Sequence, residues 1–148
     1  MKTHLEYMEF ALAEAKKAAA LGEIPVGCVI IDDDGNIIAA AHNLTEQGDA
    51  LAHAEILAIQ AAEKALGSRR LQNCTLYVTL EPCPMCAGAI LLARLKLVVF
   101  GARDWERGGL LSNYNLASNS RFGSIPVLEG FGEEQASALL KEFFAKKR

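Results

Sequence analysis

Two cysteines separated by two residues stand among prolines in Glu81-Pro82-Cys83-Pro84-Met85-Cys86. If this stretch opens a helix, Cys83 and Cys86 lie at positions i and i+3 on one face, where both sulfurs can bind one metal ion. The free N–H groups and the positive dipole end of such a helix favour thiolate, which is the form that binds metals. The pair therefore predicts a metal site, and we expect this site to determine the chemistry of the protein.

His53 is the best candidate for a third ligand, because the carboxylate of Glu55 follows it two residues later. Catalytic zinc keeps three protein ligands and one open position for water. Positions i and i+2 of a continuous helix do not share a face, so His53 and Glu55 can converge on one water only within the first turn. We therefore expect a zinc ion between two helix N-termini, one with His53 and the other with Cys83 and Cys86.

Two other interpretations of the cysteine pair stay open on these grounds alone. Cys28 and Cys74 would complete a structural site of four cysteines, although each lies singly in a β-type apolar run, where a free cysteine usually behaves as a small buried hydrophobe. A redox dithiol would leave His53 without a role. The combined spacing of His53, Glu55 and the cysteine pair favours catalytic zinc.

The elements that position these residues alternate between strand and helix along the chain. Apolar residues at steps of three and four, or in short β-branched runs, separate the two classes. We predict helices over residues 1–21, from about 53 toward 67, from about 83 to 94, and over 133–148. We predict strands over residues 24–31, 37–41, 71–80, 95–101 and 125–128. This order predicts one α/β domain over residues 1–148, with helices on both faces of the sheet.

Three connecting segments have distinct expected roles. Asp32–Asn36 is acidic but has turn chemistry, so it is interpreted as a hairpin tip rather than a cation site. Asp104–Gly123 is rich in Gly, Ser and Asn and is predicted to be a long functional loop with a short helix. Pro126 in the last strand indicates a sheet edge or a strand end.

Composition limits the class of protein and its compartment. The 148 residues are 51% hydrophobic and 22% charged, which is typical of a globular chain. A net charge of −3 gives no long-range attraction to nucleic acid, so an RNA partner would need a local basic patch. The candidates for that patch are Arg103, Arg107, Arg121, Lys146, Lys147 and Arg148. We expect a cytoplasmic protein with reduced thiols, because the sequence shows neither a membrane-length apolar run nor the order of a signal peptide.

A resemblance to a known family rests on the same residues. His53-Ala54-Glu55 followed by Pro82-Cys83-Pro84-Met85-Cys86 is similar to the H-x-E…P-C-x-x-C signature of zinc nucleobase deaminases. Longer blocks resemble the bacterial tRNA-specific adenosine deaminases, which make inosine at the wobble position of tRNA. These blocks are Ile24–Gly27, His42-Asn43, His53–Ile56, Leu80–Ala89 and Val98–Asp104, and the similarity extends over nearly the whole chain.

The resemblance implies a three-layer α/β/α fold of the cytidine deaminase type, with a central mixed five-stranded sheet. It implies one Zn²⁺ per chain and a hydrolytic reaction in which Glu55 moves the protons. It assigns base contacts to Asn43, to the backbone at Ala54 and to Val26, and it places Asp104 at the nucleic-acid entrance. Homodimers that bind the tRNA anticodon loop with both subunits are also implied.

The chain departs from the family beyond Asp104. The family commonly has a lysine and a Thr-Gly-Ala run there, whereas this chain has Trp105-Glu106-Arg107-Gly108-Gly109. Ser120–Ser124 replaces a stretch that usually contains Asn-His. Glu106 adds a negative charge where phosphate would approach, and Trp105 either stacks a base or packs. Besides a tRNA deaminase, the sequence therefore leaves open a deaminase of a free base or nucleoside (guanine, cytosine or adenosine) and a non-enzymatic module with structural zinc.

Overall fold

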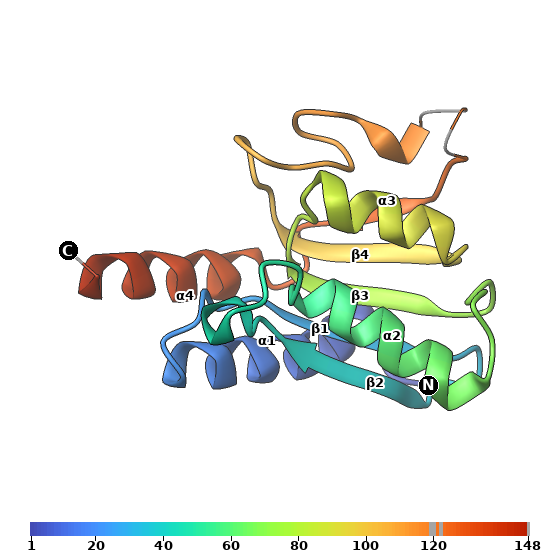
Figure 1. Ribbon diagram of the computed structural model, residues 1–148, viewed down its shortest axis with the longest axis horizontal. Coiled ribbons are helices and arrows are strands. Elements are labelled where there is room, and N and C mark those ends of the chain that lie inside the picture. The colour runs from blue at the N-terminus through green and yellow to red at the C-terminus, as the bar shows by residue number, and fades with distance from the viewer. Residues whose placement is uncertain (119–120, 122, 148) are drawn as a thin grey trace.

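The order of helices and strands in the structure, a computed structural model that describes residues 1–118, 121 and 123–147, follows the predicted alternation (Figure 1). The elements are α1 (His4–Ala20), β1 (Gly27–Ile31), β2 (Ile37–His42), η1 (Thr45–Gln47), α2 (Ala54–Leu66), β3 (Thr75–Leu80), α3 (Pro84–Leu92), β4 (Leu97–Ala102), η2 (Leu116–Ser118), β5 (Val127–Glu129) and α4 (Glu133–Lys146). The short helix expected in the loop after Asp104 is η2, a 3₁₀ helix.

Four strands begin later than predicted, β4 and β5 by two residues each, and β1 and β3 by three and four. β1 starts at Gly27 rather than Ile24, because Pro25 has no N–H group and the Val26 N–H donates back to the Ile24 carbonyl at 2.8 Å. β3 starts at Thr75 rather than Leu71, because the Cys74 N–H donates to the Leu71 carbonyl at 2.9 Å. Each of these backbone groups closes a turn instead of joining the sheet.

The sheet is mixed, with the strand order β2-β1-β3-β4-β5. β1 pairs antiparallel with both β2 and β3, whereas β3, β4 and β5 are parallel. β2, β3 and β4 therefore run in the same direction, and their carboxyl ends meet at one edge. The amino end of β1 lies at this same edge. The predicted five-stranded mixed sheet is confirmed, with β5 as the predicted edge strand.

Helices cover both faces of the sheet, as predicted. Successive residues of β1 and β3 point to opposite faces, and both directions are buried. Cys28, Ile30, Leu76 and Val78 pack with α2 and α3 in one apolar cluster. Val29, Ile31 and Tyr77 pack with α1 and with Ala136 of α4 in the second cluster. The result is the predicted three-layer α/β/α arrangement, in which α2 and α3 lie side by side (Figure 1).

The chain after β4 is packed rather than free. Leu110 is fully buried and belongs to the α2–α3 cluster, together with Ala117 of η2. In Figure 1 this orange segment runs alongside α3. The loop is therefore a fixed wall next to the cysteine helix.

α4 differs from its predicted amphipathic pattern. The sequence predicts a buried apolar stripe of Ala136, Leu139, Leu140, Phe143 and Phe144, but only Ala136 is buried, and Phe144 is 48% exposed. The described helix ends at Lys146, and Arg148 lies outside the described residues. Figure 1 shows α4 extending past the sheet, so most of its length has no strand beneath it. None of the helices in the described part of the chain has the length and apolarity that a membrane crossing needs.

Gly27 sets the distance between α1 and β1. A Cβ atom there would overlap the Ala11 carbonyl oxygen and lie 2.5 Å from the Ala15 nitrogen, and backbone atoms cannot move aside as a flexible side chain can. We predict that Gly27→Ala destabilises the protein by about 3 kcal/mol, at the upper end of typical overpacking costs. Urea denaturation monitored by circular dichroism measures this change.

Gly88 of α3 is the matched control, since a Cβ atom added there meets nothing within 4 Å. Gly88→Ala should leave stability unchanged or raise it by about 0.5–1 kcal/mol, because alanine is the better helix former. Equal midpoints for the wild type and Gly27→Ala would show that α1 does not depend on this close approach.

Candidate active site

Two helices begin at the edge where β2, β3 and β4 end, and each has a predicted ligand at its start. His53 is the N-cap of α2 and Cys83 is the N-cap of α3, both with extended backbone. Pro84 occupies the first turn of α3, where its missing N–H group is harmless and its fixed φ favours the helix. Both positive dipole ends therefore point toward the same small region.

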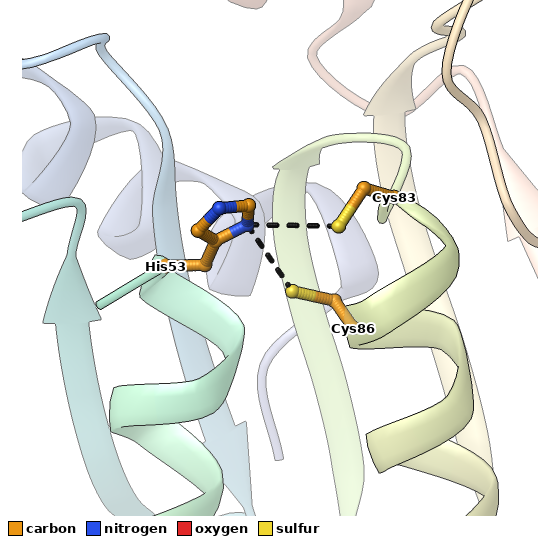
Figure 2. A group of neighbouring side chains, drawn as sticks. All are labelled: His53, Cys83 and Cys86. Carbon is orange, nitrogen blue, oxygen red and sulfur yellow. Dashed lines mark hydrogen bonds between the residues drawn. The ribbon is translucent and has the colours of Figure 1, made fainter. Parts of the chain in front are cut away.

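The three side chains converge in that region (Figure 2). His53 Nδ1 lies 3.6 Å from Cys83 Sγ and 3.4 Å from Cys86 Sγ. Each of the three residues offers one ligand atom, and these three atoms lie within 4.8 Å of one another. Cys83 and Cys86 reach it from one face of α3, as their spacing predicts.

This donor set fits zinc. Two thiolate sulfurs and one imidazole nitrogen would hold a zinc ion with three protein ligands, which is the number found in catalytic rather than structural sites. Within the described part of the chain, Cys28 and Cys74 do not join the ligand group and are instead buried in the apolar cluster. The alternative of a four-cysteine site is therefore not assembled.

The pKa values of the two thiols are shifted in opposite directions. A hydrogen bond from the Cys86 thiol, helped by His53, lowers the pKa of Cys83 to about 4. The same hydrogen bond, followed by burial, raises the pKa of Cys86 far above its ordinary value. The hydrogen bond to Cys83 also raises the pKa of His53. A divalent cation would displace the proton of the Cys86 thiol, so this arrangement is suited to metal binding coupled to proton release.

Glu55 lies beside this group in the first turn of α2 and is only 4% exposed. Burial, reinforced by the negative charge of Cys83, raises its pKa to about 7, although His53 and hydrogen bonds oppose the shift. A carboxyl group with this pKa gains and loses a proton easily near neutral pH. The first-turn placement expected from the His53–Glu55 spacing is observed.

Asn43 ties the site to β1 and α2. Its buried Oδ1 accepts a hydrogen bond from the Ala54 N–H at 2.8 Å, and its own backbone N–H donates to the Val26 carbonyl at 3.2 Å. The three residues that the resemblance assigned to base contacts are therefore neighbours. The Ala54 N–H is already engaged by Asn43, so the amide nitrogen of Asn43 is the group of this pair that can donate to a substrate.

Asp104 is the N-terminal residue of a tight turn. Its carboxylate accepts from the backbone N–H groups of Glu106 at 3.2 Å and Arg107 at 3.0 Å, and its carbonyl accepts from the Gly108 N–H at 2.7 Å. Asp104 thus shapes the first turn of the loop that follows β4. This position is compatible with an entrance residue, but its carboxylate has a local structural partner.

Glu81 is the functional residue that sequence reasoning missed. Its carboxylate is 2% exposed and accepts from the backbone N–H groups of Asp104 at 3.1 Å and of Leu111 and Ser112 at 2.9 Å each. It therefore holds the loop after β4 against the start of α3. Nearby, a Cβ atom on Gly109 would lie 2.8 Å from the Cys83 backbone, so the loop touches a metal-ligand residue directly. The only available signal was a charged residue directly after a strand rich in apolar residues.

Glu23 does the same on the other side of the site. It is 1% exposed, and its two carboxylate oxygens both accept from the Glu46 N–H at 3.1 Å. This contact orders the segment that leads from Asn43 to His53. Two buried carboxylates therefore position the two loops that border the metal group.

Several of the basic side chains predicted to bind RNA have partners within the protein. Arg103 forms a two-point ion pair with Glu129 at 2.8 and 2.9 Å, and Lys146 pairs with Glu142 at 3.1 Å. Lys147 lies over the Phe143 ring at 5.2 Å, and Arg148 lies outside the described residues. Arg107 and Arg121 are exposed.

Comparison with known proteins gives a consistent answer. The family described as the cytidine and deoxycytidylate deaminase zinc-binding region matches residues 1–102. A tRNA-specific adenosine deaminase of Bacillus subtilis is 49% identical over 144 residues, covering 96% of this chain and 89% of that protein. A solved structure from a study of A-to-I editing by tRNA:A34 deaminases has a TM-score of 0.87 and 42% identity, covering 91% of this chain and 99% of the other.

A guanine deaminase of Nitrosomonas europaea shares the fold at lower identity. Its TM-score is 0.85 at 26% identity, with 98% of this chain and 86% of the other covered. The two adenosine deaminases match at higher identity, 49% and 42% against 26%, as the blocks around His53 and Cys83 indicated. The chain therefore belongs to the zinc-binding deaminases of the cytidine and deoxycytidylate type and, among them, to the family of tRNA-specific adenosine deaminases.

Proposed function

We propose that this protein hydrolyses adenosine to inosine at the wobble position of a tRNA anticodon loop. The observation that carries the proposal is the convergence of His53, Cys83 and Cys86 beside a buried Glu55, in a chain whose relatives over nearly its full length are tRNA-specific adenosine deaminases. We further propose that residues 1–148 act as one domain, since both ends of the chain pack on the same sheet.

His53, Cys83 and Cys86 would hold one Zn²⁺, and the dipoles of α2 and α3 would support the two thiolates. When bound, zinc supplies a water of lowered pKa at its open position. Glu55 is the catalytic acid and base in this proposal, because its buried carboxyl group interacts with His53, Cys83 and Cys86.

Glu55 carries out the proton transfers in sequence. It removes a proton from the attacking water and delivers it to a ring nitrogen as the C–O bond forms at C6 of adenine. It then moves the second water proton to the amino group, and the C–N bond breaks to release ammonia. The product base is hypoxanthine, and the sum is one water consumed for each ammonia formed. A pKa of about 7 suits a group that must do both tasks.

Substrate binding follows from the residues around Glu55. Asn43 would donate from its amide nitrogen to an acceptor of the base, since its oxygen is held by Ala54. The target base must leave its stack to reach a zinc ion at this depth, and anticodon loops already present unstacked bases. Asp104 and Val26 would border the entrance and the wall.

A second candidate is a deaminase of a free base or nucleoside. The guanine deaminase of Nitrosomonas europaea has the same fold, and Glu106 places an exposed negative charge on the turn after β4. A carboxylate there would repel a phosphate backbone but would not hinder a small neutral base.

The substrate can be identified by measuring ammonia release. We predict that the protein deaminates an anticodon stem-loop with adenosine at the wobble position and leaves guanine, cytosine and free adenosine unchanged under the same conditions. The matched control is the same stem-loop with guanosine at that position. Turnover of a free base, with none of the stem-loop, would favour the second candidate.

Replacement of the carboxyl group separates an enzyme from a structural zinc module. We predict that Glu55→Gln lowers kcat by about 10²- to 10⁴-fold, the usual contribution of general acid–base catalysis, while one zinc per chain remains bound. Cys86→Ser is the contrasting variant, since it should lose zinc as measured by atomic absorption. Unchanged kcat in Glu55→Gln would refute the assigned mechanism.

We also propose that the protein is a homodimer in the cytoplasm. α3 is apolar on all sides, and it leaves Met85 36% exposed in its first turn, next to the metal ligands, and Leu92 81% exposed at its C-terminal end. Large exposed apolar side chains on one helix are typical of an interface. The four cysteines are all free thiols, as expected in a reducing compartment.

The dimer can be tested by introducing a charge on the exposed apolar surface of α3. We predict that Leu92→Glu converts the protein to a monomer in sedimentation equilibrium, because an unpaired charge at an apolar interface is costly to desolvate. Leu21→Glu is the control, since Leu21 is 58% exposed at the end of α1, on the opposite face of the sheet. A dimer that survives Leu92→Glu would place the interface elsewhere.

A further inference from the structure

Trp105 is a rigidly mounted aromatic side chain on the surface next to the active site. It is 71% exposed, although an indole that contributed to folding would be buried. The Arg103 guanidinium lies 4.8 Å from the centre of the ring and covers one face. The two-point ion pair with Glu129 holds that guanidinium in place. The Arg103 guanidinium therefore orients the indole from one face, and the rest of the indole is open to solvent.

The turn below Trp105 is also fixed. The Asp104 carboxylate accepts the next two backbone N–H groups of the turn after Trp105, and the Asp104 N–H donates to the buried Glu81. Glu81 lies two residues before Cys83. A short chain of contacts thus connects the indole to a residue of the proposed metal site. This is the arrangement of a binding platform, because both the ring plane and its position relative to the site are set before a ligand arrives.

We propose that the open face of Trp105 stacks a nucleobase of the RNA next to the target adenosine. This inference rests on the proposed function and adds a contact for a neighbouring nucleotide. Aromatic side chains stack any base, since every base has a π face, and an arginine behind the ring adds to the contact. It also changes the role of Arg103: its charge is neutralised by Glu129, so it orients the platform instead of binding phosphate.

The fluorescence of the protein gives a direct readout, because Trp105 is its only tryptophan. The probe is the zinc-loaded Glu55→Gln variant, which binds without turnover, titrated with an anticodon stem-loop. We expect saturable quenching that follows the binding measured independently by anisotropy of a labelled RNA. A stem-loop with abasic nucleotides on both sides of the wobble position should still bind, but with little quenching. RNA binding without quenching by the intact loop overturns the inference.

Kinetics on the otherwise native enzyme provide a second test. Trp105→Ala should raise the KM for the stem-loop by about 5- to 150-fold with little change in kcat, and Trp105→Phe should recover part of the loss. Phe10→Ala is the matched control: Phe10 is 43% exposed under the Lys2 ammonium, 6.0 Å from the ring centre, on the helix that covers the other face of the sheet. Equal KM values for Trp105→Ala and the wild type would refute the proposal.

The two proposals fail in different ways. If the wild type does not deaminate the stem-loop but single-stranded RNA still quenches Trp105, the reaction assignment is wrong and the platform stands. If the wild type deaminates the stem-loop and Trp105 is neither quenched nor needed for KM, only the platform is wrong. If no RNA binds, both proposals are refuted.

Discussion

The meeting of two helix N-termini at one edge of the sheet is the constraint on which the site depends. α2 and α3 each follow a strand that ends at this edge, so their positive ends face the same point. The electrostatic field of the two helix ends favours thiolate. The placement of the helices brings His53 Nδ1 within 3.6 Å of Cys83 Sγ. The same geometry buries Glu55 and raises its pKa to about 7, so the feature that gathers the ligands also perturbs the proposed acid–base group.

Buried carboxylates make this edge rigid. Glu23 and Glu81 are almost inaccessible to water, and each accepts hydrogen bonds from a neighbouring loop. Glu81 accepts from three backbone N–H groups, and Glu23 accepts from the Glu46 N–H and the Thr45 hydroxyl. A buried anion with several such donors is stable as long as all of them stay in place, so the loops and the carboxylates order each other. The stacked pair of Arg103 and Trp105 begins where one of these loops leaves the sheet.

Local patterns predicted most of the fold. The four α-helices and five strands were all expected from apolar periodicity, whereas the 3₁₀ helix η1 was not. β1 and β3 began latest, because Pro25 and the Leu71 turn diverted the backbone. The ligand set and the first-turn position of His53 were predictable because metal geometry restricts spacing. The contacts of Glu81 and the Arg103–Glu129 pair could not be predicted. The partners of Glu81 lie 23 to 31 residues away and Glu129 lies 26 residues from Arg103, and a lone charged residue in a sequence is usually assigned to the surface. The exposed half of α4 was missed because periodicity indicates an apolar face but not whether the sheet extends far enough to cover it.

Glu81 holds the loop after β4 almost entirely by its main chain, through the amides of Asp104, Leu111 and Ser112. Every residue type except proline supplies such an amide, so the exposed side chains of residues 105–107 can be exchanged without loosening the anchor, whereas Gly108 and Gly109 have no room for a side chain. Substitutions at positions 105–107 therefore have room to accumulate while the metal centre keeps its shape. The fold thus keeps the metal site fixed while residues 105–107, at the proposed entrance, can change. One scaffold can in this way evolve, or be redesigned, toward new substrates.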